Sequence, residues 1–80
     1  MVEKIYEQFK DYNEVKIKVY NVEYTIEKQY GDFIIYQSQN KLRSQHYDTI
    51  EDLIENYIVY GENLKNNLHS IELVLDDIKE

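Results

Sequence analysis

Residues 14–27 read EVKIKVYNVEYTIE, and this stretch decides the fold. Apolar residues alternate with polar ones along residues 15–19 and again along residues 22–26, and the phase slips by one position at Asn21. Such alternation is typical of strands with one buried face, and a two-residue turn at Tyr20-Asn21 accounts for the slip. We therefore expect a β-hairpin with these cross-strand partners: Val19–Val22, Ile17–Tyr24 and Val15–Ile26 on the buried face, and Lys18–Glu23 on the other.

A helix and a third strand are expected on either side of this hairpin. Apolar residues at positions 2, 5, 6, 9 and 12 follow the helical period and predict a helix over residues 2–11. After the hairpin, Gly31-Asp32 predicts a second tight turn, because glycine tolerates the positive φ that such turns need. Residues 33–37 would form the third strand and the polar residues 38–45 a long loop. The second turn would set Tyr30 opposite Phe33 and Lys28 opposite Ile35.

The C-terminal half of the sequence predicts two further helices. Asp48 or Thr49 would cap the first, because each has an acidic residue three positions later, which is the spacing of a capping box. The buried stripe of this helix would consist of Ile50, Leu53, Ile54 and Tyr57. Beyond Gly61, leucine and isoleucine recur every three or four residues, which predicts another helix over residues 62–78. The alternative is a short helix between two strands at 58–60 and 71–75, because Ile71, Leu73 and Leu75 also alternate.

These elements predict one α+β domain over residues 1–80: a helix, a three-stranded antiparallel meander and two C-terminal helices. The hydrophobic fraction of 42% is typical of a folded chain. The absence of cysteine excludes disulfides and thiolate metal sites. Apolar runs are too short for a membrane span, and the start Met-Val-Glu-Lys-Ile lacks a signal-peptide pattern. We therefore expect a cytoplasmic protein that does not bind a membrane.

The negative charge of the chain lies almost entirely in its second half. Residues 1–43 hold seven acidic and seven basic residues, whereas residues 44–80 hold nine acidic residues against two lysines, so they carry the whole net charge of −7. An acidic chain is a poor direct ligand for nucleic acid, whose binding depends on lysine and arginine. The charge distribution instead predicts a surface that meets a basic partner.

One helix of the acidic half would carry its carboxylates in a row. Asp48, Glu51, Asp52 and Glu55 follow the spacing i, i+3, i+4, i+7, which places them on one face over roughly 10 Å of helix. That is about one charge per 2.6 Å, comparable with one per about 1.7 Å in duplex DNA. A solvated helix face is the ordinary explanation for any single one of these acids. As a set they are our first choice for partner-binding residues, followed by Glu72, Asp76 and Asp77.

Other polar residues give weaker signals. His46 and His69 lack the spacing of a metal site, and the sequence has no glycine-rich phosphate loop or convincing catalytic set. We therefore expect no metal, no cofactor and no enzymatic activity. Four tyrosines are candidates for interface anchors or for ordinary packing: Tyr20, Tyr36, Tyr47 and Tyr60.

In layout and charge, the chain resembles small acidic phage-encoded inhibitors, and most closely the compact anti-CRISPR proteins that block Cas9. The resemblance rests on the order helix, meander, two helices and on the acidity, not on a sequence motif. It implies a non-enzymatic inhibitor whose acidic residues occupy the nucleic-acid-binding groove of a host defence nuclease, in the cytoplasm of the host cell.

Two alternatives remain open. The stretch Tyr60-Gly61-Glu62-Asn63-Leu64 resembles the turn that opens the ribonuclease-binding helix of barstar-type inhibitors, which implies an antitoxin or immunity protein. That family carries aspartates in the helix after this turn, where the present sequence has Lys65 and His69. The other alternative is a small assembly module that homodimerises through its tyrosines and the leucine seam of residues 62–78.

Overall fold

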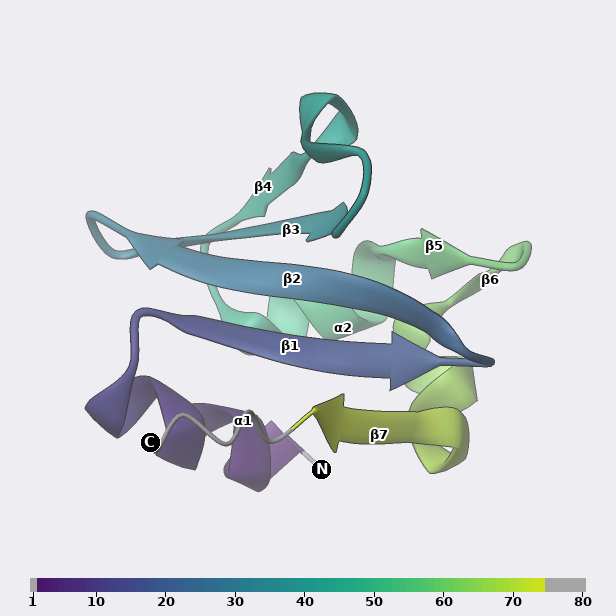
Figure 1. Cartoon of the computed structure of the whole chain (residues 1–80), viewed down its shortest axis with the longest axis horizontal. Helices are drawn as coiled ribbons and strands as arrows, with labels where there is room; N and C mark the ends of the chain where they lie inside the picture. Colours follow the sequence, from purple (N-terminus) through teal and green to yellow (C-terminus); the bar gives the residue numbers. More distant parts are fainter. Residues whose placement is uncertain (1, 75–80) are drawn as a thin grey trace.

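The structure is a computed structural model of the chain, and residues 2–74 of it are described here. It is an α+β fold in which an antiparallel five-stranded sheet has the order β4-β3-β2-β1-β7, and a separate two-stranded hairpin pairs β5 with β6 (Figure 1). The elements in chain order, with η for 3₁₀ helices, are α1 (Val2–Asp11), β1 (Glu14–Val19), β2 (Val22–Gln29), β3 (Asp32–Gln37), η1 (Lys41–Arg43), β4 (Gln45–Tyr47), α2 (Ile50–Asn56), β5 (Ile58–Val59), β6 (Glu62–Asn63), η2 (Leu64–Ser70) and β7 (Ile71–Val74).

The hairpin expected from residues 14–27 is confirmed. The register of β1 and β2 contains all four predicted pairs, from Val15–Ile26 to Val19–Val22. Tyr20 and Asn21 form the turn with φ of 51° and 69°. Two successive positive φ angles are characteristic of a type I′ turn, whose twist matches that of the strands it joins. The helix predicted over residues 2–11 is also confirmed as α1.

The second hairpin forms one residue earlier than predicted. Its turn is Tyr30-Gly31, with φ of 51° and 90°, and Asp32 already pairs with Gln29. The predicted pairs Tyr30–Phe33 and Lys28–Ile35 are therefore wrong, and the observed ones are Lys28–Phe33 and Ile26–Ile35. A type I′ turn favours glycine at its second position. Gly31 therefore occupies the second position, and the turn consists of Tyr30 and Gly31 rather than Gly31 and Asp32.

The predicted meander with two C-terminal helices is wrong, although the α+β class is right. The expected loop at 38–45 contains η1 and leads into β4, and no helix spans the described part of residues 62–78. The alternative prediction, a short helix between strands at 58–60 and 71–75, is closer to the structure, because strands β5 and β7 flank a short 3₁₀ helix. Strand β7 pairs with β1, which places Ile71 opposite Val19 and Leu73 opposite Ile17. This pairing gives β1 a second hydrogen-bonded neighbour, a long-range gain that outweighs the helical spacing.

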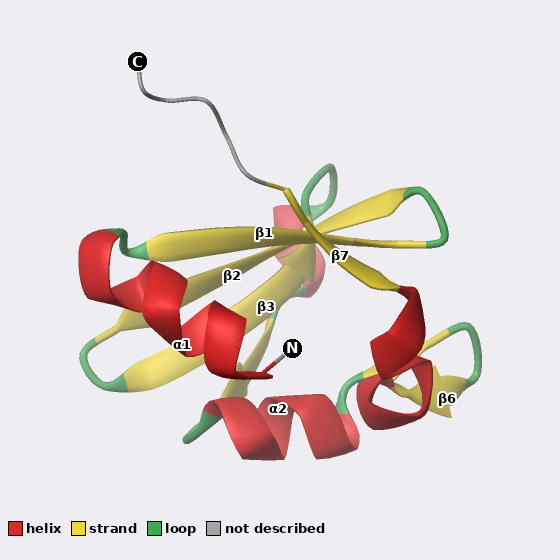
Figure 2. Ribbon diagram, turned by 90° about the horizontal axis from the view of Figure 1, so that it is seen from below, coloured by secondary structure: helices red, strands yellow, loops and turns green. Residues whose placement is uncertain are grey.

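One face of the sheet holds the core. Figure 2 shows α1 and α2 together on one side of the sheet, and aromatic contacts join the layers, as between Phe9 of α1 and Phe33 of β3 with ring centres 5.4 Å apart. The largest side chains with no appreciable exposure come from both layers: Ile5, Ile17, Ile26, Ile35, Ile50, Leu53, Leu64 and Val19. Both helices pack on one apolar face of the sheet. This packing determines which side of each helix is buried and which side is exposed.

A substitution in the second turn tests the backbone geometry. We expect Tyr30→Asn to raise the free energy of unfolding by about 0.5–1 kcal/mol, because asparagine adopts positive φ more readily than tyrosine. Tyr30 is fully exposed, so its ring contributes little packing that could be lost. The matched change Gly31→Ala should lower stability by about 1 kcal/mol, although no atom lies within 4 Å of the added methyl group. Urea denaturation measures both, and a destabilised Tyr30→Asn variant would contradict the turn assignment.

Candidate functional site

Helix α2 presents its carboxylates to solvent. The Thr49 side chain accepts a hydrogen bond of 3.0 Å from the backbone N–H of Asp52, which caps the helix and decides between the two predicted caps. The predicted stripe is confirmed, since Ile50, Leu53 and Ile54 are buried, as is Tyr57 directly after the helix. Burial of this stripe turns the acidic positions outward. Three of them, Glu51, Asp52 and Glu55, lie on α2, and Asp48 lies immediately before the cap; all four are exposed.

We call Asp48, Glu51, Asp52 and Glu55 the α2 acidic row. Tyr6 of α1 donates a hydrogen bond of 2.7 Å to Glu51, which ties the row to the neighbouring helix. Burial, followed by this hydrogen bond, raises the pKa of Tyr6. Lys65 of η2 lies 3.8 Å from Glu55 and is the only base within ion-pair distance of the row in the described part of the chain. The row therefore remains strongly negative.

The second predicted group of acids does not extend this row. Glu72 lies in β7 opposite Lys18, between Ile71 and Leu73, whose side chains contribute to the core face. Because successive side chains of a strand point to opposite faces, Glu72 lies on the sheet face away from α2. Asp76 and Asp77 lie outside the described residues. Of the seven predicted site residues, the structure thus places Glu51, Asp52 and Glu55 together on α2. The prediction that Asp48 shares their helix face is wrong, because the helix begins at Ile50 and Asp48 lies before the extended cap residue Thr49.

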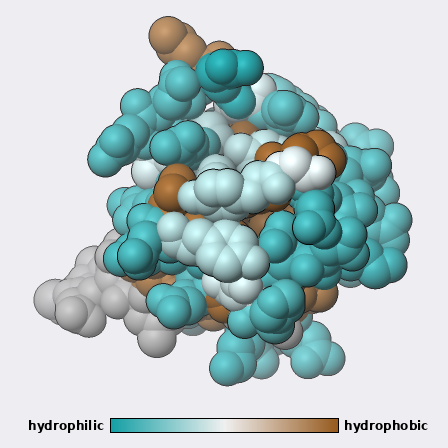
Figure 3. All heavy atoms as spheres, turned by 90° about the vertical axis from the view of Figure 1, so that its right-hand side faces the viewer, coloured by the Kyte–Doolittle hydropathy of each residue, from teal (hydrophilic) through white to brown (hydrophobic). Residues whose placement is uncertain are grey.

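Two of the candidate tyrosines meet at one end of the molecule. The turn between β1 and β2 carries Tyr20, the turn between β5 and β6 carries Tyr60, and the ring centres lie 5.3 Å apart at an interplanar angle of 79°. We call Tyr20 and Tyr60 the tyrosine pair. Figure 1 shows both turns at the same end of the fold. Figure 3 looks onto this end, where pale and brown residues gather within a hydrophilic surround.

The other two candidate tyrosines have packing roles. Tyr36 is buried on the sheet face away from the helices, and it donates a hydrogen bond of 2.5 Å to Glu27. Lys41 of η1 lies 3.5 Å from Glu27 and covers the Tyr36 ring. These contacts hold the segment between β3 and β4 against the sheet. Tyr47 is half-buried in β4, opposite Phe33.

This network shifts two pKa values in opposite directions. The hydrogen bond from Tyr36 is the largest cause that lowers the pKa of Glu27, and Lys41 adds to it. Burial, followed by the same hydrogen bond to a carboxylate, raises the pKa of Tyr36 to about 12. Both shifts favour the charge state in which tyrosine donates to an ionised glutamate.

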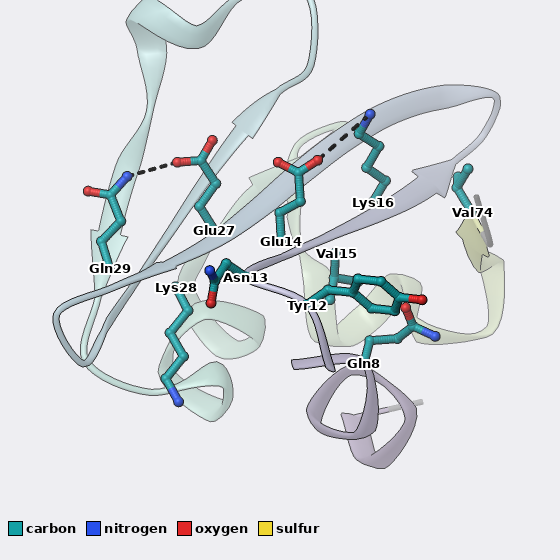
Figure 4. A pocket seen from close by; sticks show the side chains of 10 residues that line it. All are labelled: Gln8, Tyr12, Asn13, Glu14, Val15, Lys16, Glu27, Lys28, Gln29 and Val74. Carbon is teal, nitrogen blue, oxygen red and sulfur yellow. Dashed lines mark hydrogen bonds and ion pairs between the residues drawn. The ribbon is translucent and has the colours of Figure 1, made fainter. Parts of the chain in front are cut away.

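A shallow depression of about 650 Å³ lies beside the end of α1 (Figure 4). Four of its polar side chains are paired with one another: Gln29 donates to Glu27 over 2.8 Å, and Lys16 lies 3.9 Å from Glu14. Lys28 points away from Glu14 and Glu27 in this view. This arrangement does not aim charged groups at one point, so we assign no ligand to it.

Within residues 2–74 neither histidine lies in a cluster of metal-binding side chains. His46 lies in β4 opposite Ile34, and His69 is exposed in η2. Within residues 2–74 no three histidine, aspartate or glutamate side chains gather in a way that could hold a metal ion. The helices in this range are also too short or too polar to cross a bilayer.

Comparison with known proteins gives no relative: no family model, curated protein or solved structure matches the chain. The functional argument therefore depends on the chemistry of this structure alone.

Acid titration tests the network around Glu27. Its folded-state pKa is lowered, so its contribution to stability is present above the unfolded-state pKa of about 4.3 and is lost as pH falls through the folded-state pKa. We expect Glu27→Gln to lower the free energy of unfolding by about 1–2 kcal/mol at pH 7. As pH falls, the free energy of unfolding of this variant should decrease less than that of the wild type. Urea denaturation between pH 3 and pH 7, a range of about four units around that pKa, measures both effects.

Glu14→Gln provides the control for that titration. Glu14 lies directly opposite Glu27 in β1 and is exposed. We expect this change to alter stability by less than about 0.5 kcal/mol. Equal pH profiles for the two variants would contradict the role assigned to Glu27.

Proposed function

We propose that this chain is a non-enzymatic acidic inhibitor, of phage or mobile-element type, that occupies the nucleic-acid-binding groove of a host defence nuclease. The α2 acidic row is the proposed contact surface, and we propose that it mimics nucleic-acid phosphates. Of the resemblance to anti-CRISPR proteins only the acidity supports this proposal, because the predicted layout of helix, meander and two helices is wrong. The proposal places the protein in the host cytoplasm and requires no metal or cofactor. The single observation that carries it is the exposure of four carboxylates along one short segment.

The spacing of the charges supports this proposal. Glu51, Asp52 and Glu55 span four helical steps, or about 6 Å along the axis. Their density is of the same order as that of duplex DNA, with one charge per about 1.7 Å. A groove lined with lysine and arginine therefore meets a comparable negative charge on α2.

The rigidity of α2 supports it as well. The helix is anchored by fully buried Ile50 and Leu53 and by the Thr49 cap. Tyr6 further restricts Glu51. Residues that are already ordered in the free protein lose little further conformational entropy on binding. A preorganised row of carboxylates therefore binds at a smaller entropic cost than a flexible acidic tail.

The surroundings of the charges distinguish the row from an ordinary solvated surface. On the outer face of the sheet, acids alternate with bases, as where Lys18 lies between Glu23 and Glu72 on the neighbouring strands. Such mixing is typical of surfaces that maintain solubility. The α2 acidic row is met by Lys65 alone in the described chain, so its field is not cancelled locally.

The alternatives fare differently. An antitoxin or immunity protein would use the same electrostatic mechanism against another target. The homodimer alternative relied partly on a leucine seam along a helix over residues 62–78. In the structure Leu64 is buried in the core and residues 71–74 form a strand, so such a helical seam is not available.

Neutralising the row tests the proposal. In a DNA-cleavage assay with guide-loaded Cas9 enzymes, we expect the wild-type chain to inhibit at low salt and to lose potency as salt screens the contact. The variant Asp48→Asn/Glu51→Gln/Asp52→Asn/Glu55→Gln should lose about tenfold or more in inhibitory potency.

A matched variant controls for net charge. Asp11→Asn/Glu14→Gln/Glu23→Gln/Asp32→Asn removes the same number of charges from the N-terminal half and should retain inhibition within about threefold, the effect of weak long-range screening alone. Equal potency of the two variants would refute the α2 acidic row as the contact surface. Failure of the wild-type chain to inhibit any of the Cas9 enzymes would refute the anti-CRISPR assignment.

A further inference from the structure

Each of the three tight hairpin turns within residues 2–74 places a tyrosine where tyrosine is unfavourable. Tyr20, Tyr30 and Tyr60 each occupy the first turn position, with φ of 51°, 51° and 54°. Left-handed backbone is uncommon for residues other than glycine, asparagine and aspartate, and it costs other residues about 1 kcal/mol or more. Residues kept in such conformations are often kept for their side chains.

Two of these tyrosines form an ordered exposed surface. Tyr20 and Tyr60 keep 53% and 61% of their surface exposed while their rings meet edge to face, and Ile58 of β5 is 59% exposed. The hydroxyl of Tyr20 donates to Oδ1 of Asn67 over 3.3 Å. Asn67 is buried and donates in turn to the backbone carbonyl of Val59. The rings are therefore held in place before any partner arrives.

This surface is too small to bind a second copy by itself. Aromatic side chains bury about 150–250 Å² each when fully covered, so the exposed parts of the tyrosine pair and Ile58 amount to roughly 300–400 Å². A stable protein interface needs about 800 Å² on each partner. The tyrosine pair must therefore belong to a larger contact surface.

Acidic residues lie close to the tyrosine pair along the chain. Glu62 follows Tyr60 by two residues in the same hairpin, is exposed, and forms no ion pair with the residues that the structure describes. The α2 acidic row ends at Glu55, three residues before Ile58, where Lys65 lies 3.8 Å from Glu55. Aromatic rings beside carboxylates match one cationic side chain best: the planar guanidinium of arginine stacks on a ring and also pairs with a carboxylate.

We propose that the tyrosine pair binds an arginine side chain of the basic partner, with Glu62 as the accompanying carboxylate. This inference rests on the proposed function, because it extends the contact of the α2 acidic row to the adjoining end of the molecule. The row supplies long-range attraction, and the tyrosine pair selects arginine over lysine at short range. Tyrosine and arginine are both enriched among the residues that dominate interface energetics.

Two peptides of equal length and charge, oligo-arginine and oligo-lysine, test this inference by calorimetric titration at low salt. We expect both peptides to bind and oligo-arginine to bind more tightly. Tyr60→Asn should reduce that preference by about threefold, the effect of one exposed cation–π contact. Tyr60→Phe should retain the preference, because it keeps the ring.

Tyr30→Asn is the matched control. It makes the same substitution in an equivalent Tyr-Gly turn at the other end of the sheet, with nearly the same φ. Its preference for oligo-arginine should equal that of the wild type. Both Asn variants keep a turn-compatible residue, so neither should impair folding.

The outcomes separate the two proposals. If both peptides bind but Tyr60→Asn keeps the full arginine preference, or Tyr30→Asn loses it equally, the role of the tyrosine pair is refuted and the α2 acidic row is not. If neither peptide binds the wild-type chain at low salt, the proposed function fails and this inference fails with it.

Discussion

The structure depends on the position of β1 between two strands. The Tyr20-Asn21 turn sets its register with β2, and β7 returns from the far end of the described chain to pair along its other edge. This pairing places Val15, Ile17 and Val19 on a single face. Because side chains alternate strictly along a strand, a slip of one residue would turn all three toward solvent.

The functional surfaces follow from this constraint. One apolar sheet face must be covered, and α1 and α2 cover it with their buried stripes (Figure 2). The carboxylates of α2 therefore face outward on a helix that the core holds still. The same hairpin register brings the β1–β2 turn to the end where the β5–β6 turn lies, which joins Tyr20 to Tyr60. The α2 acidic row and the tyrosine pair are thus consequences of one packing arrangement.

The sequence predicted the features that depend on neighbouring residues. Alternation along residues 14–27 determined the first hairpin, and helical spacing determined α1 and the buried stripe of α2. The capping residue was narrowed to two candidates because the motif is local. The α2 acidic row could be predicted as a pattern, since its members lie within eight positions of one another. Strand β7 appeared only as the alternative to a helix, because the alternation of its residues competes with an equally good helical pattern. Its pairing with β1 could not be predicted, because that pairing joins residues more than fifty positions apart. The contact between Tyr20 and Tyr60 could not be predicted either, because the two turns lie far apart in the sequence.

The central claim is that the α2 acidic row is a specific electrostatic contact surface rather than a set of solvated acids. Chemical-shift mapping of backbone amides during titration with oligo-lysine, at low and then at high salt, tests it most directly. The account predicts the largest shifts over residues 48–55, and their loss at high salt. Shifts of similar size at acids throughout both halves of the chain would contradict it, because they would indicate diffuse attraction without a site.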